Sequence, residues 1–71
     1  MAIPPLDHPC WRKLANGSFS KIRTKHLGTQ LLAKRLERGN IPEQEKIAEM
    51  HAFFTRWERI LDNEIAQLNT L

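Results

Sequence analysis

Apolar residues recur at steps of three and four over the C-terminal part of the chain, residues 42–69. An α-helix turns by about 100° per residue, so this spacing collects them on one side of a helix. Pro42 suits the first helical position, and Glu43 and Glu45 suit the positive end of the helix dipole. The pattern predicts one helix about 40 Å long. Its apolar face, assigned to the core or to an oligomer seam, holds Ile47, Met50, Phe53, Phe54, Trp57, Ile60, Leu61 and Leu68.

A second amphipathic pattern spans residues 18–38. Serines at its start can cap a helix, and Gly39-Asn40 after it is typical of a helix end. The connection to residue 42 is short, which predicts that helices 18–38 and 42–69 form an antiparallel hairpin. The apolar face expected to pack on the long helix holds Phe19, Ile22, His26, Ala33 and Leu36.

The N-terminal part predicts a short helix over residues 8–15, ended by Asn16-Gly17. Asp7 can cap this helix. Pro4 and Pro5 favour an extended arm over residues 1–7, because proline fixes φ and lacks an N–H group. We therefore expect a single all-α domain over residues 1–71, a helical hairpin with a short helix and an arm laid across it.

Two positions interrupt these helical patterns. Gly28 lies inside the helix predicted over 18–38, where it costs about 1 kcal/mol relative to alanine, so it marks a close helix approach or a bend. Glu64 lies inside the apolar face of the long helix. A buried lone carboxylate is costly, so we expect Glu64 to reach water, to pair, or to meet a cation of another chain.

The composition points to a small protein of a reducing compartment. The chain has 71 residues and one cysteine, so it forms no internal disulfide, and we expect a cytoplasmic location. No apolar stretch is long enough to span a membrane. The formal net charge is +3, with most basic residues before residue 40 and most acidic residues after it. This asymmetry indicates either packing of one half on the other or a basic surface for an acidic partner or nucleic acid.

The only cluster of possible metal ligands or nucleophiles is Asp7-His8-Pro9-Cys10. A zinc site needs three or four ligands, and a second ligand pair is missing from the sequence. A cysteine nucleophile needs a histidine base, an orienting group and a pocket, which a helical hairpin rarely offers. We expect no metal, no cofactor and no catalytic activity.

Leu27 and Leu31 lie on the opposite side of helix 18–38 from its predicted core face. Apolar anchors with a charged rim are typical of a protein–protein contact. Two interpretations remain open: the N-terminal arm covers the leucines, or they bind a partner. The residues assigned to this partner face are Arg23, Leu27, Leu31, Lys34, Arg35 and Arg38.

The stretch after Asn16-Gly17 suggests a different function. A short helix, a glycine turn and a basic helix start resemble the helix-turn-helix arrangement of DNA-binding proteins. The side chains that would contact nucleic acid are Ser18, Ser20, Lys21, Arg23, Thr24 and Lys25.

The leading hypothesis is a non-enzymatic protein–protein interaction module, such as an adaptor, an inhibitor, a chaperone or a small component of a larger assembly. We expect it to be dimeric, because the apolar face of helix 42–69 is wider than one short chain can cover. The alternative is a DNA-binding regulator that uses the basic start of helix 18–38.

Overall fold

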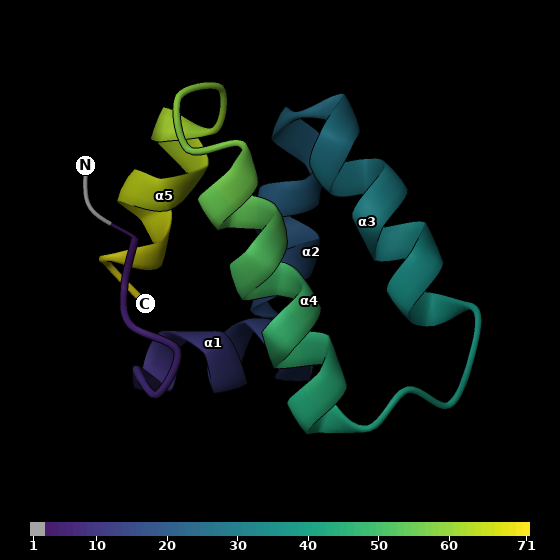
Figure 1. The fold of residues 1–71 in the computed structure, drawn as a ribbon. Coiled ribbons are helices and arrows are strands. Elements are labelled where there is room, and N and C mark those ends of the chain that lie inside the picture. Colours follow the sequence, from purple (N-terminus) through teal and green to yellow (C-terminus); the bar gives the residue numbers. More distant parts are fainter. Residues whose placement is uncertain (1–2) are drawn as a thin grey trace.

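The computed structural model describes residues 3–71, apart from the side chain of Thr24, which lies outside the described part. The described chain is built of helices and turns without a strand, so the predicted all-α class is confirmed. In chain order the helices are α1 (Pro9–Lys13), α2 (Phe19–Ile22), α3 (Leu27–Glu37), α4 (Glu43–Arg56) and α5 (Asp62–Leu68). Helix α4 lies between α3 and α5, and α1 passes across its lower end (Figure 1).

The N-terminal arm is held by Trp11 of α1. Its indole N–H donates to the carbonyl oxygens of Pro5, at 2.9 Å, and Pro4, at 3.3 Å. Pro9 opens α1, and the Nδ1 atom of His8 accepts a hydrogen bond of 3.1 Å from the N–H of Cys10. The cap is therefore His8, one residue after the aspartate that the sequence suggested.

The predicted stop at Asn16-Gly17 is a kink in the backbone. A wider π-type turn over Leu14–Ser18 joins α1 to α2. Within it Gly17 has φ of +132°, a conformation that only glycine adopts without strain. The chain thus changes direction here and continues into α2, which has only four residues.

The prediction of one helix over residues 18–38 is wrong, because His26 interrupts it. His26 is extended, with φ of −149° and ψ of 134°, and its Nδ1 atom accepts a hydrogen bond from the N–H of Gly28. The Thr29 hydroxyl donates to the carbonyl oxygen of His26 at 2.7 Å. These contacts give α3 a cap of its own, so a new helix is stabilised where the sequence suggested continuation.

The prediction of one helix over residues 42–69 is also wrong. Helix α4 ends at Arg56, a tight turn follows, and α5 begins at Asp62. The N–H of Leu61 bonds the carbonyl oxygen of Trp57 at 2.9 Å, which closes the turn. Folding α5 back buries apolar side chains that a straight 40 Å helix would expose, and this gain exceeds the cost of breaking the helix.

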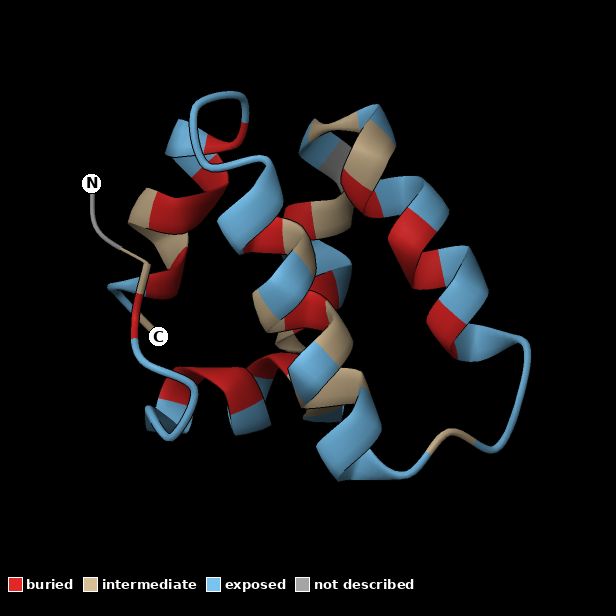
Figure 2. Cartoon of the chain, viewed as in Figure 1, coloured by how far each residue is buried: buried red, intermediate tan, exposed pale blue. Residues whose placement is uncertain are grey.

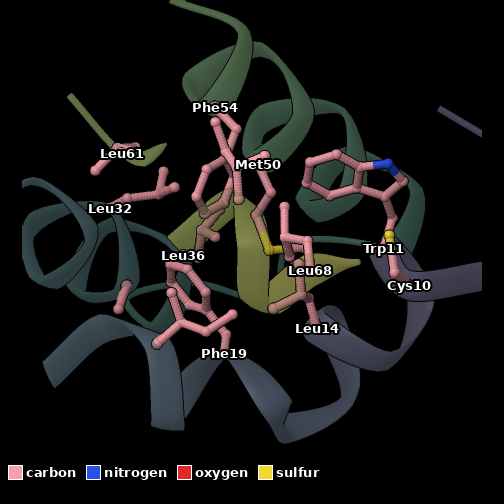
Figure 3. Close-up of a cluster of buried hydrophobic side chains, with 13 residues drawn as sticks. Cys10, Trp11, Leu14, Phe19, Leu32, Leu36, Met50, Phe54, Leu61 and Leu68 are labelled. Atoms are coloured by element: carbon pink, nitrogen blue, oxygen red, sulfur yellow. The ribbon is translucent and has the colours of Figure 1, made fainter. Parts of the chain in front are cut away.

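The core collects two or three side chains from each helix, with Leu14 and Leu61 from the turns between them (Figure 3). Trp11 and Phe54 are its largest fully buried members, with ring centroids 5.8 Å apart. Glu64 is also buried, with 4% of its surface exposed, so of the three alternatives expected for it, open exposure to water is excluded. The apolar core members are Cys10, Trp11, Leu14, Phe19, Ile22, Leu32, Ala33, Leu36, Met50, Phe54, Leu61, Ile65 and Leu68.

Candidate functional site

Leu27 and Leu31 of α3 are exposed, and Figure 2 shows several exposed stretches along this helix. Their exposed fractions are 68% and 59%. Residues 3–7 of the arm do not cover them, and its Pro4 and Pro5 carbonyl groups instead meet the Trp11 indole. Of the two interpretations left open by the sequence, cover by the arm is therefore wrong, and the leucines are accessible.

Leu31 also borders a groove of about 430 Å³ between α3 and the C-terminal end of α4. We call this the α3–α4 groove. Its apolar lining comes from α3, α4 and the turn that follows α4. The lining consists of Leu31, Leu32, Phe53, Trp57 and Ile60, together with His26, Gly28, Arg35 and Arg56.

The turn after α4 holds two exposed apolar side chains, Trp57 and Ile60. Trp57 is 41% exposed and Ile60 is 55% exposed, so neither belongs to the core of the single chain, and their place in an oligomer seam stays a prediction. In a continuous helix Trp57 would share a face with Met50 and Phe54. In the structure both Trp57 and Ile60 line the groove.

Phe53 forms the wall between the groove and the core. Its ring centroid lies 5.8 Å from that of Phe54, which is fully buried, and 6.5 Å from that of the exposed Trp57. The other predicted seam residues lie inward: Met50, Phe54, Leu61 and Leu68 are buried, and Ile47 is half-buried against the core. The seam predicted from the sequence is thus divided between the core and the groove.

Gly28 lies at one end of the groove, where a side chain in its place would meet two rings. A Cβ atom at Gly28 would lie 2.9 Å from the His26 ring and 3.1 Å from the Phe53 ring. Both distances are shorter than ordinary carbon contacts. Of the two alternatives that the sequence offered for Gly28, the structure shows the tip of the Phe53 ring of α4 close to it and a break in the helix at His26, two residues earlier.

Two arginines carry the charge of the groove. Arg35 of α3 forms an ion pair with Glu49 of α4, with 3.3 Å between Nη2 and Oε1, while most of its side chain stays exposed. The second oxygen of Glu49 is buried and has no hydrogen-bond partner among the described residues. Arg56 forms no ion pair with a carboxylate within residues 3–71. Of the described residues that line the groove, none is acidic.

The predicted cationic rim is only partly assembled. Arg35 lines the groove with Leu31. Arg23 instead pairs with Glu37, and with Lys34 it borders a separate hollow on the other flank of α3. Arg38 is exposed just after the end of α3.

The residues of the nucleic-acid alternative are spread around α2 and the turn after it. Lys21 and Lys25 are exposed, whereas Ser18 is half-buried. The Ser20 hydroxyl donates to the carbonyl oxygen of Gly17 at 2.8 Å. Arg23 is paired as described above, and the side chain of Thr24 lies outside the described part. The helix on which these residues were expected to lie, α2, is a single turn.

In the cluster from Asp7 to Cys10, His8 and Cys10 have roles in the fold. His8 caps α1, and Cys10 is fully buried. Burial raises the pKa of the Cys10 thiol above its ordinary value of 9.0, which keeps it protonated and unreactive. Within residues 3–71 no group of three or more His, Cys, Asp or Glu side chains is placed to hold a metal ion. No described helix has the length and apolar character needed to cross a bilayer.

The sequence pointed to Leu31 and Arg35 as partner-binding residues. It did not show that they form one surface with residues of α4 and the turn after it, namely Phe53, Arg56, Trp57 and Ile60. The only sequence signal is the excess width of the apolar pattern over residues 42–69, which indicated that part of it stays uncovered. Comparison with protein-family models, with curated proteins and with solved structures finds no match to this chain. The candidate site therefore rests on its own geometry.

Proposed function

We propose that this chain is a non-enzymatic protein–protein interaction module and that its α3–α4 groove receives a segment of a partner protein. The observation that carries the proposal is the gathering of large exposed apolar side chains, Leu31, Trp57 and Ile60, around one groove with arginines on its rim. Leu27 extends the same patch along α3. An apolar patch of a few hundred Å² on a small protein commonly marks a binding surface.

The chemistry of the groove supports a protein partner. Tryptophan and arginine are the residues most often found at the energetic centre of protein interfaces. Trp57 lies beside Arg56 in the chain, and both line the groove. An apolar floor with a polar rim is the usual composition of such a contact.

Two structural predictions accompany this proposal. We keep the antiparallel pairing of α3 and α4 as a prediction, which residual dipolar couplings can test. Homodimerisation also stays a prediction. We expect a dimer because the apolar face of residues 42–69 is wider than one short chain can cover. Part of that face, Leu61 and Leu68, is covered by the core of the single chain. Sedimentation equilibrium at low micromolar concentration measures it directly.

Affinity capture with a matched pair of variants tests the function. Leu31 and Leu6 are similarly exposed leucines, at 59% and 52%, but Leu6 does not line the groove. A protein captured by wild type and by Leu6→Asp, but lost with Leu31→Asp, is a ligand of the groove. If every captured protein is retained by Leu31→Asp, the groove is not the interaction surface.

DNA binding is the second candidate, favoured by the exposure of Lys21 and Lys25 beside the kink at Gly17. Phosphate contacts make affinity fall steeply with salt. A gel shift with random duplex DNA at rising salt measures this dependence. Lys25→Ala should weaken such binding and Leu31→Asp should not, whereas the groove proposal expects the reverse for the protein partner.

A further inference from the structure

The α3–α4 groove is apolar at its floor and positive at its edge. Arg35 and Arg56 line it, and Arg59 borders the neighbouring hollow that shares Trp57 and Ile60 with it. Arg35 pairs with Glu49, but most of the Arg35 side chain stays exposed. Its guanidinium can therefore donate to a second carboxylate. Complementary charge across an interface favours encounter and excludes wrong partners, so a ligand of this groove should be acidic at its edges.

A second copy of the chain fits this surface poorly. A two-fold dimer uses the same patch on both subunits. Arg35 and Arg56 of one copy would then approach the cations of the other, with no acidic residue among the described lining to separate them.

The backbone of the ligand is constrained as well. Buried N–H and C=O groups need hydrogen-bond partners. An extended segment obtains them from an exposed strand edge, and residues 3–71 contain no strand. A helix satisfies its own backbone groups and presents side chains at steps of three and four. Leu27 and Leu31 lie one turn apart on α3, so side chains one turn apart on a ligand helix can each contact one of them.

We infer that the α3–α4 groove binds an amphipathic helix of a partner protein whose apolar face is flanked by aspartate and glutamate. This inference rests on the proposed function and specifies the chemistry of the partner. The apolar face of that helix packs on Leu31, Trp57 and Ile60, and its carboxylates meet Arg56 and the free side of Arg35. A small apolar acid would fill the groove but leave Leu27, which lies outside the lining, uncovered.

The test uses the full chain and two synthetic helical peptides of about 16 residues. Both carry leucine at every third or fourth position. One has glutamate at the flanking positions and the other has lysine there. Fluorescence anisotropy of end-labelled peptide gives the affinity of each. We expect the acidic peptide to bind at least tenfold more tightly than the basic peptide at about 50 mM salt, with a smaller difference at about 300 mM because salt screens exposed charges.

Paired variants separate the apolar and the charged contributions. Leu31→Asp should weaken the acidic peptide at least tenfold, and Leu6→Asp should not. Arg56→Glu should weaken the acidic peptide and strengthen the basic one. Its matched control is Lys13→Glu, an exposed cation on α1 away from the groove, which should change neither. Far-UV circular dichroism verifies that each variant is folded.

The inference is overturned if the acidic peptide fails to bind, or if the basic peptide binds equally well. Binding of dodecanoate without the acidic peptide would also overturn it, in favour of a small-molecule site. So would a wild-type dimer that Leu31→Asp dissociates, in favour of a second copy. Failure of the peptides together with capture of a Leu31-dependent protein would remove only this inference. Absence of any Leu31-dependent protein would remove the proposed function itself.

Discussion

The indole N–H of Trp11 donates a hydrogen bond of 2.9 Å to the carbonyl oxygen of Pro5. The Pro5 carbonyl oxygen also accepts the His8 N–H at 2.9 Å, in the turn through Leu6 and Asp7, and its second lone pair can take the indole proton. A buried indole in turn needs an acceptor. The two requirements are met together, which fixes the arm over α1. Leu27 and Leu31 of α3 are exposed.

The two tryptophans should differ sharply in their effect on stability. Trp11 is fully buried and hydrogen-bonded, so Trp11→Ala should lower the free energy of unfolding by about 3–5 kcal/mol. Trp57 is 41% exposed, so Trp57→Ala should cost about 1 kcal/mol or less. Urea unfolding followed by far-UV circular dichroism measures both. Equal losses would show that Trp57 is covered in solution, as a dimer seam requires.

Gly28→Ala should destabilise the protein although alanine is the better helix former. Alanine gains about 1 kcal/mol in helix propensity. The added Cβ would lie 2.9 Å from the His26 ring, which caps α3, and 3.1 Å from Phe53. Displacing both side chains should exceed the gain, so we expect a net loss of about 1 kcal/mol or more.

Gly39→Ala is the matched control for this substitution. A Cβ at Gly39 has no atom within 4 Å, and its backbone is not in the left-handed region. We expect a change within about 0.5 kcal/mol, measured by the same urea unfolding. If Gly28→Ala is as stable as Gly39→Ala, the close approach of α3 to Phe53 does not exist in solution.

The helical segments and their inward faces were predictable from periodicity. Met50, Phe54 and Leu68 are buried as expected, because each lies on the apolar side of its own helix, and Leu61 is buried in the turn before α5. Exposure of Leu27 and Leu31 also followed from helical phase, and the structure removed only the alternative that the arm covers them.

The breaks between helices were not predictable in the same way. Neither glycine nor proline occurs between Trp57 and Leu61, so the sequence contains no local signal for the turn. Burial of α5 against the core decides it, and this depends on residues far away in the chain. The break at His26 depends on a side-chain nitrogen acting as a cap, a role more often filled by Ser, Thr, Asp or Asn. Both breaks border the groove, which explains why its residues were not recognised together.

The buried thiol of Cys10 should make stability depend on alkaline pH. Burial raises its pKa above 9.0 in the folded protein, whereas the unfolded chain ionises near the ordinary value. The folded state therefore retains the proton longer. The resulting stabilisation is complete below about pH 9 and is lost as the pH rises through the raised pKa. We expect wild type to lose more stability than Cys10→Ala between about pH 8 and about pH 10, measured by urea unfolding.

The comparison with Cys10→Ala isolates the thiol, because lysine titration affects wild type and this variant equally. A thiol-specific reagent gives an independent measurement. Cys10 is fully buried and is the only cysteine, so labelling of the native protein should be limited by opening of the fold. Labelling of the native protein as fast as that of the urea-unfolded chain would contradict both expectations.

The double substitution Leu27→Ala with Leu31→Ala separates binding from stability. Both side chains are largely exposed, so the isolated protein should melt within about 0.5 kcal/mol of wild type. Leu32→Ala, on the buried side of the same helix, should cost about 2–5 kcal/mol through lost burial and a residual cavity. Chemical unfolding of the three proteins side by side tests this difference.

Binding of the acidic peptide should be lost in the double variant although its stability is unchanged, because Leu27 and Leu31 then contact only the partner. A large stability loss in the double variant, with binding retained, would place the leucines in the fold and transfer the binding site elsewhere.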